Sequence, residues 1–215
     1  MRQLFGIVLA ILLASSANLA KGNETVSKSP MPAGKFWQII DASAEHKADR
    51  KRQLKQLNSD LSRLDAPQVH SFDLAFELQM QRAYTWDLWG GAYIMLGGAS
   101  DDGFVYFRRW LISQGSSTFE AALRNAENLA DLLPPDTKEF PEFEEFAYVG
   151  MEVLRKKTGK WPWDPGAEYT MDSVAPGNKE PRGERFVDSE EHLSKRYPKL
   201  WKRFARSPLE PQEDY

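Results

Sequence analysis

Two adjacent aspartates, Asp101 and Asp102, follow a glycine-rich turn in the segment GGASDDGFVYFRRWLISQG and are the residues best suited to chemistry. Paired carboxylates can catalyse proton transfer or hold a divalent metal ion if they converge on one point. Asp87 or the glutamates within residues 142–145 could complete such a site. With Arg108 nearby to bind an anion, the arrangement would suit a hydrolase-type enzyme.

The same turn also fits the start of a helix, and we favour this interpretation. Ser100 is a typical N-cap residue, which would place Asp101 and Asp102 in the first helical turn. An acid in that position stabilises the helix by about 0.3–1 kcal/mol through its interaction with the positive end of the helix dipole. Capping therefore accounts for the pattern without any catalytic role.

Arg108 and Arg109 follow one or two helical turns later. In the structural interpretation, a partly buried arginine pairs with Asp87 or Asp102 and holds two helices in register. In the functional interpretation, its planar guanidinium binds a carboxylate or phosphate ligand through two parallel hydrogen bonds. The sequence leaves both interpretations open.

Aromatic residues form a second candidate site in WDLWGGAY, where Trp86 and Trp89 are three residues apart. Aromatic side chains at this helical spacing are more typical of a core than of a ligand platform. The alternative is a binding cleft in which Trp86, Trp89 and Trp110 stack against a sugar or a base.

Other signatures of chemistry are missing from the sequence. His46, His70 and His192 do not have the spacing of a zinc-binding helix, and no nucleophile elbow or phosphate-binding loop is present. We therefore expect no metal site and no cofactor. The formal net charge of −3, without a basic domain, argues against nucleic acid as the main partner.

The elements that must position these residues are helices, since helical periodicity runs through most of the chain. We predict a single all-α domain of about six to eight helices. A helix pair should break near residues 83–85, the sequence STFE (residues 117–120) should open a helix as a capping box, and a long irregular loop should span residues 160–187. The last helix should be interrupted before Pro198.

The first twenty residues have the composition of a secretory signal peptide, with Arg2, an apolar run from Leu4 to Ala14 and small residues after it. Cleavage after Ala17 or Ala20 is expected, and an uncleaved anchor is the alternative. Eleven apolar residues are too short for a stable membrane span. The predicted domain boundaries follow from these patterns: residues 1–20 signal peptide, 21–34 flexible linker, 35–205 helical domain and 206–215 acidic disordered tail.

The central block AYTWDLWGGAYIMLGGASDDGFVYFRRWLISQG, followed by FEAALRNAENLAD, resembles the bacterial domain-of-unknown-function family numbered 4240. FWQIIDAS and RYPKLWKRF resemble its flanking elements, so the resemblance covers most of residues 35–205. It implies no activity, because none is assigned to the family. This chain departs from the family pattern in having Ala99 in place of a cysteine, and in having an export signal.

Two functions follow as hypotheses. The first is an exported, non-enzymatic binding module in the periplasm or outside the cell, whose aromatic surface and long loop engage a protein or glycan partner. The second is the hydrolase-type enzyme that uses Asp87, Asp101 or Asp102 with Arg108. We favour the binding module, and we expect no membrane span to remain after the signal peptide is removed.

Overall fold

The predicted helical periodicity is realised as ten α-helices and two short 3₁₀ turns in the computed structural model, which describes residues 29–135, 137, 140–169, 177 and 179–210. The all-α class is confirmed. The predicted number of helices was too low, because short helical segments beside the long ones form separate elements. The elements are α1 (Ala33–Ala44), α2 (Arg50–Ser62), α3 (Ala66–Arg82), α4 (Trp86–Leu96), α5 (Asp101–Ser113), α6 (Ser116–Arg124), η1 (Ala126–Asn128), α7 (Leu129–Leu132), η2 (Glu144–Ala147), α8 (Tyr148–Thr158), α9 (Glu190–Arg196) and α10 (Pro198–Phe204).

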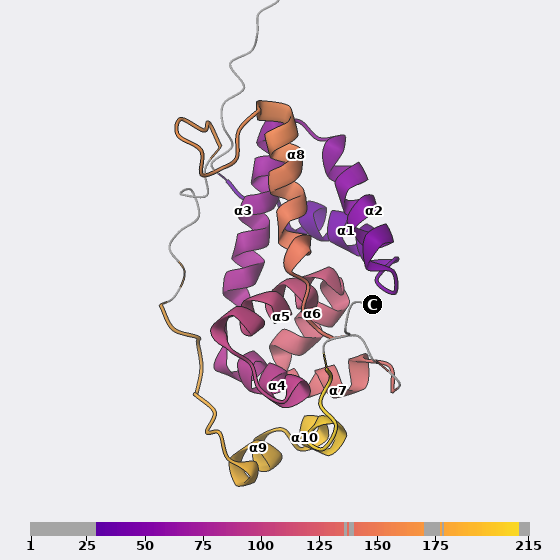
Figure 1. Ribbon diagram of the computed structural model, residues 1–215, viewed down its shortest axis with the longest axis vertical. Helices are drawn as coiled ribbons and strands as arrows, with labels where there is room; N and C mark the ends of the chain where they lie inside the picture. Colours follow the sequence, from indigo (N-terminus) through magenta and orange to yellow (C-terminus); the bar gives the residue numbers. More distant parts are fainter. Residues whose placement is uncertain (1–28, 136, 138–139, 170–176, 178, 211–215) are drawn as a thin grey trace, which may run out of the picture.

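The helices form two tiers (Figure 1). The upper tier contains α1, α2, α3 and α8, in which α8 packs closely on α3 and α2. The lower tier contains α4 to α7 with α9 and α10, and α5 joins the tiers through contacts with α1 and α3. One apolar core runs through both tiers, and Phe36, Phe107 and Trp110 are among its most deeply buried side chains.

Local capping chemistry explains where several helices begin. Asp65 and Gln68 form a complete capping box at the start of α3, and Thr85 caps α4 after the predicted break. Ser189 caps α9, and the chain breaks again at Tyr197 before Pro198 starts α10. The breaks before α4 and before Pro198 confirm the sequence predictions, because each depends on residues within one turn of the boundary.

The start of α6 corrects the sequence prediction. Residues 117–120 do not form a capping box, because the helix already begins at Ser116 and has no side-chain cap of its own. Asp41 on α1 supplies the cap instead, accepting hydrogen bonds from Ser116 N at 2.6 Å and from Ser116 Oγ at 2.7 Å. Gly115 (φ +93°) leaves room for this carboxylate, since a Cβ there would lie 2.9 Å from Asp41 Oδ1.

The described ends of the chain also differ from the predicted boundaries. Met31, assigned to the linker, is 5% exposed and donates from its backbone N–H to the carbonyl of Ser71. Leu209, assigned to the tail, is 8% exposed and donates to the carbonyl of Met95. Apolar contacts therefore hold these residues to the domain. The predicted signal peptide lies outside the described residues.

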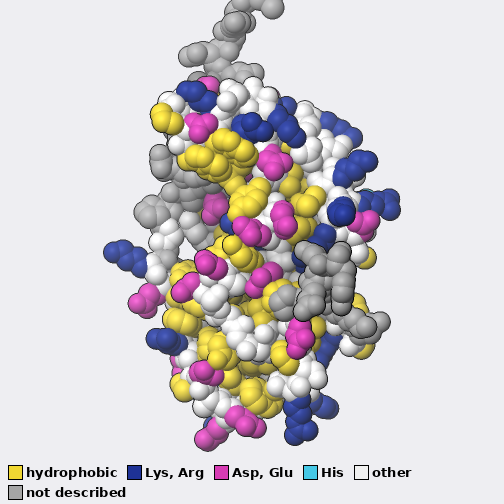
Figure 2. Space-filling model, in the orientation of Figure 1, with side chains coloured by type: hydrophobic (Ala, Val, Ile, Leu, Met, Phe, Trp, Pro, Cys, Tyr) yellow, Lys and Arg dark blue, Asp and Glu magenta, His cyan; other side chains and the backbone are white. Residues whose placement is uncertain are grey.

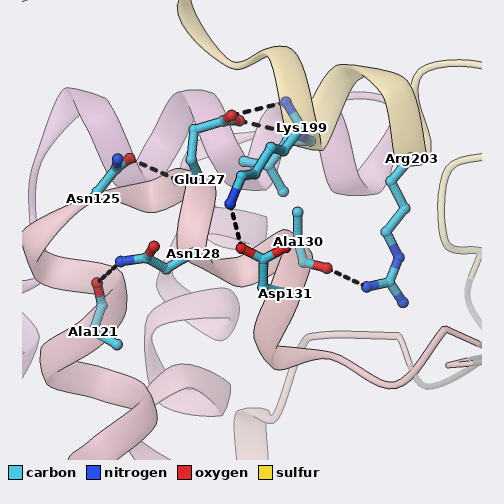
Figure 3. Close-up of polar contacts among 9 residues, drawn as sticks. Ala121, Asn125, Glu127, Asn128, Ala130, Asp131, Lys199 and Arg203 are labelled. Atoms are coloured by element: carbon cyan, nitrogen blue, oxygen red, sulfur yellow. Dashed lines mark hydrogen bonds and ion pairs between the residues drawn. The ribbon is translucent and has the colours of Figure 1, made fainter.

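The C-terminal helices attach to the lower tier through charged contacts (Figure 3). The carboxylate of Glu127 in η1 accepts hydrogen bonds from the first backbone N–H groups of α10, at Lys199 (2.8 Å) and Leu200 (3.1 Å). The Lys199 ammonium pairs with Asp131, and Arg203 donates to the carbonyl of Ala130 at 2.6 Å. The Glu127 carboxylate thus caps α10, a helix that begins 71 residues later in the chain.

Candidate functional site

The SDDG turn forms the start of α5. Ser100 Oγ accepts a hydrogen bond from Gly103 N at 3.1 Å, and Asp101 and Asp102 are exposed in the first turn. Asp87 lies on α4, where it accepts from Ala126 N at 3.1 Å and pairs with Arg196 at 3.7 Å. The helix-start interpretation accounts for the first two aspartates, and Asp87 binds a different part of the fold.

Metal coordination was the other chemistry considered for these carboxylates. Within the residues that the structure describes, no group of three or more histidine, cysteine, aspartate and glutamate side chains could hold a metal ion. Glu142, part of the glutamate cluster, lies beside Gly103, and burial raises the pKa of its carboxyl group.

The two arginines have structural partners other than the acids expected from the sequence. Arg108 is 9% exposed and donates to the carbonyls of Phe104 (3.3 Å) and Met80 (2.9 Å), which ties α5 to the end of α3. Its guanidinium also lies 4.7 Å from the ring centre of Tyr84. Burial lowers the pKa of Arg108 to about 10. The predicted pairing with Asp87 or Asp102 is therefore wrong for this residue.

Arg109 lies on the neighbouring face of α5 and binds the segment that precedes α8. It donates to the carbonyl of Glu144 at 3.1 Å, and its guanidinium lies 5.5 Å and 5.2 Å from the ring centres of Tyr106 and Tyr148. Its buried Nε has no hydrogen-bond partner. These contacts position η2 against α5.

Two acidic residues of α3 lie near Arg108 and Arg109 and were missed by the sequence analysis. Asp73 is 5% exposed, and its Oδ2 atom has no hydrogen-bond partner. Burial, with the nearby charge of Glu77, raises the pKa of Asp73 well above its usual range. Burial also raises the pKa of Glu77, although Arg109 and Arg108 oppose this shift.

A signal for these acids is present in the sequence FDLAFELQ. Asp73 and Glu77 are four residues apart, so they share one face of a helix whose neighbouring positions are almost all apolar. The sequence does not show which helix packs against this face of α3. That helix is α8, whose backbone at Gly150 is so close that a Cβ there would lie 1.8 Å from Asp73 Oδ1.

The tryptophans of the proposed aromatic cleft do not line a common surface. Trp110 is 1% exposed and packs on Phe107 in the core. Trp89 stacks between Trp86 and Phe104, with ring centres 5.2 Å and 4.8 Å away, and donates to the carbonyl of Ala99. The guanidinium of Arg185 lies 4.9 Å from the ring centre of Trp86. Protein groups therefore take the stacking positions that a sugar or base would need.

A different tryptophan pair reaches the surface in the turn that follows α8, residues 159–169, which we call the tryptophan turn. Trp161 and Trp163 stack with ring centres 5.0 Å apart and an interplanar angle of 8°. Arg155 lies 4.7 Å from the ring centre of Trp161, and Trp163 is 65% exposed. Figure 2 shows a hydrophobic patch at the upper end of the molecule, where Figure 1 places this turn.

Hydrogen bonds fix the conformation of the tryptophan turn. Asp164 accepts from Trp161 N at 2.8 Å, and the Lys160 ammonium donates to the carbonyls of Pro165 and Gly166, each at 3.0 Å. Tyr169 closes the turn, since it is 4% exposed and packs on His70 of α3. Trp163 is therefore held in its exposed position by the structure of the turn.

Among the described helices, none has both the length and the apolar character needed to cross a membrane.

Comparisons with known proteins place the chain in a family. Neither the curated proteins nor the solved structures gave a match. One family model, described as a protein of unknown function (DUF4240), matches residues 31–156, which is more than half of the chain. The protein therefore belongs to the DUF4240 family.

Proposed function

We propose that this protein is a non-enzymatic interaction module that binds its partner through the tryptophan turn. The observation that carries this proposal is the exposure of Trp163, 65% of whose surface faces solvent from a hydrogen-bonded turn. Large exposed aromatic side chains are enriched at binding surfaces because they lose much apolar area to a partner at low entropic cost. The four cations within residues 155–160 add charge beside this apolar surface.

The hydrolase-type alternative has weaker support. Its candidate carboxylates lie at the starts of two different helices, where Asp87 already binds Ala126 N and Arg196. Arg108 is held by two backbone carbonyls and two aromatic rings. An active site needs groups that converge on one accessible point, and these groups each have a separate structural role.

The proposed location is outside the cytoplasm, based on the signal-like composition of residues 1–20. The partner would then be a component of the cell envelope.

A footprinting experiment tests the binding surface without knowledge of the partner. The chain has no cysteine, so a single Pro165→Cys change in the full chain gives one reactive thiol within the turn. Its alkylation rate by a maleimide is measured with and without the envelope fraction of the producing cells. Leu132→Cys, at a 38% exposed position on α7, is the matched control.

We expect the envelope fraction to slow alkylation at position 165 and to leave position 132 unchanged. Adding Trp163→Ala to the Pro165→Cys chain should abolish the protection, because the exposed indole provides the contact. Equal rates at position 165 with and without the envelope fraction would reject the proposed function.

A further inference from the structure

We propose that the tryptophan turn and the cationic end of α8 dock this protein onto the surface of an anionic lipid bilayer. The inference rests on the proposed function and names the partner of the same surface. It predicts peripheral binding, in which indole rings enter the interface between headgroups and acyl chains while basic side chains contact anionic headgroups.

The segment that runs from the end of α8 into the tryptophan turn is basic, whereas the whole chain is acidic. Residues 153–163, VLRKKTGKWPW, contain four cations and no acid, whereas the complete chain has a formal net charge of −3. Arg155, Lys156 and Lys160 are exposed. Three acids flank this segment: Glu152 and Glu168 are exposed, and Asp164 accepts a hydrogen bond from Trp161 N. Basic clusters beside apolar residues are attracted to anionic lipid surfaces.

The aromatic residues have the chemistry that suits a bilayer interface. Tryptophan collects at the level of the lipid headgroups, because its large ring is apolar while its indole N–H stays hydrated. The Arg155–Trp161–Trp163 stack fixes the rings, so little conformational freedom is lost when Trp163 enters the interface. A glycan platform would more typically surround the ring with hydrogen-bond acceptors, and here a guanidinium lies 4.7 Å from the ring centre of Trp161.

The described chain begins at this same end of the molecule. Ser71 Oγ donates to the carbonyl of Ser29, and the neighbouring His70 packs on Tyr169, which closes the tryptophan turn. Figure 1 shows the start of the described chain and the turn together beside the upper part of α3. The N-terminal segment that carries the apolar run Leu4–Ala14 therefore joins the domain beside the tryptophan turn.

Site-specific fluorescence on the full chain tests this proposal. A polarity-sensitive fluorophore is attached at Pro165→Cys, or at Leu132→Cys as the control. Emission is recorded with vesicles of phosphatidylcholine alone and with vesicles that also contain phosphatidylglycerol. The same titrations are repeated at high salt and with Lys156→Ala or Trp163→Ala added to the Pro165→Cys chain. Lys156 is suitable because it is exposed and lies outside the hydrogen bonds that fix the turn.

We expect a blue shift at position 165 only with the anionic vesicles, lost at high salt, and no shift at position 132. Lys156→Ala should weaken vesicle binding roughly fivefold, the ratio expected for one cation near an anionic surface. Trp163→Ala should remove the shift. An equal shift with neutral vesicles, or a shift that persists in Trp163→Ala, would overturn the proposal because the N-terminal run alone would account for binding.

The two proposals fail separately. Protection of position 165 by the envelope fraction, without a shift on anionic vesicles, would overturn the membrane inference and indicate a protein or glycan partner. Absence of protection by the envelope fraction would reject the interaction surface itself.

Discussion

The carboxyl group of Asp73 lies between α3 and α8, where Oδ2 has no hydrogen-bond partner and the backbone at Gly150 packs against Oδ1. A buried carboxylate with an unpaired oxygen is costly when ionised, so burial favours the protonated form and raises the pKa. Because the folded state retains this proton to a higher pH than the unfolded chain does, the free energy of unfolding declines as pH rises from about 4 through the raised pKa.

Replacing Asp73 with asparagine should therefore stabilise the protein at neutral pH. Each unit by which the pKa of Asp73 is raised corresponds to about 1.4 kcal/mol of destabilisation once the carboxyl is ionised. We expect the urea midpoint of Asp73→Asn to exceed that of the wild type at pH 8 and to change less between pH 5 and pH 8.

Asp102→Asn is the matched control, since Asp102 is exposed in the first turn of α5. Removing the negative charge of Asp102 should destabilise the protein by no more than about 1 kcal/mol, because only its interaction with the helix dipole is lost. If the urea midpoint of Asp73→Asn varied with pH as that of the wild type does, ionisation of the buried Asp73 would not be the cause of the pH dependence.

Gly150 provides a second test at the same contact. An alanine Cβ at this position would lie 1.8 Å from Asp73 Oδ1, inside a buried interface that cannot yield freely. We expect Gly150→Ala to lower the free energy of unfolding by about 1–3 kcal/mol, and the further change Asp73→Ala to restore part of it. Chemical denaturation provides the measurement.

Gly34→Ala is the control for Gly150→Ala, because no atom lies within 4 Å of its added Cβ. Alanine favours the helix there, so stability should stay the same or rise by up to about 1 kcal/mol. A Gly150→Ala protein as stable as the wild type would contradict the close packing of α3 on α8.

At the scale of whole elements, the sequence predicted what depends on neighbours in the chain. Ser100 starts a helix as predicted, and the break before Pro198 is present. Contacts between distant segments were not predictable. The Asp41 cap of α6 joins residues 75 apart, so the local pattern STFE gave the wrong helix start.

The candidate site shows the same division between features that local sequence predicts and features that depend on contacts between distant segments. Trp86 and Trp89 have helical spacing and stack on each other, and Trp89 also packs, partly buried, against the core. Trp161 and Trp163 flank Pro162 without periodicity, so their exposure depends on how the turn folds against α3. The burial of Asp73 likewise depends on α8, which lies far along the chain.

The start of α6 yields a prediction for this element. Asp41→Ala removes two hydrogen bonds to Ser116, so it should destabilise the protein by about 1–2 kcal/mol. Ser117→Ala is the matched control, because Ser117 is exposed inside the helix and does not cap it. Thermal unfolding of the two variants should separate them, and a larger loss in Ser117→Ala would restore the capping-box interpretation.

At the scale of the whole molecule, a segment beyond the family match lies over the lower tier. The described residues 179–210 follow the matched region, which ends at residue 156, and Arg182 pairs by backbone hydrogen bonds with Tyr84 and Trp86 beside the start of α4. Asp188 accepts a hydrogen bond from the Tyr93 hydroxyl at 2.7 Å. Leu200 is completely buried on the same tier. This C-terminal segment completes the core of the domain.

Glu127 should control how firmly that segment is attached, because its carboxylate accepts two backbone N–H groups at the start of α10. Hydrogen bonds to a charged group contribute about 1.5–3 kcal/mol each, and Glu127→Gln weakens both by removing the charge. We expect hydrogen exchange in α9 and α10 to accelerate at least about tenfold, which corresponds to about 1.4 kcal/mol of local stability.

Exchange in α3 and α8 should stay at the wild-type rate, since these helices pack in the upper tier without contact with Glu127. Asp131→Asn is the control, because the Lys199–Asp131 pair is more than half exposed and exposed pairs contribute at most about 1 kcal/mol. Equal acceleration of exchange in both tiers by Glu127→Gln would contradict this prediction, because the C-terminal segment would then unfold only together with the whole domain. The rest of the domain would in that case need the attached C-terminal segment in order to stay folded.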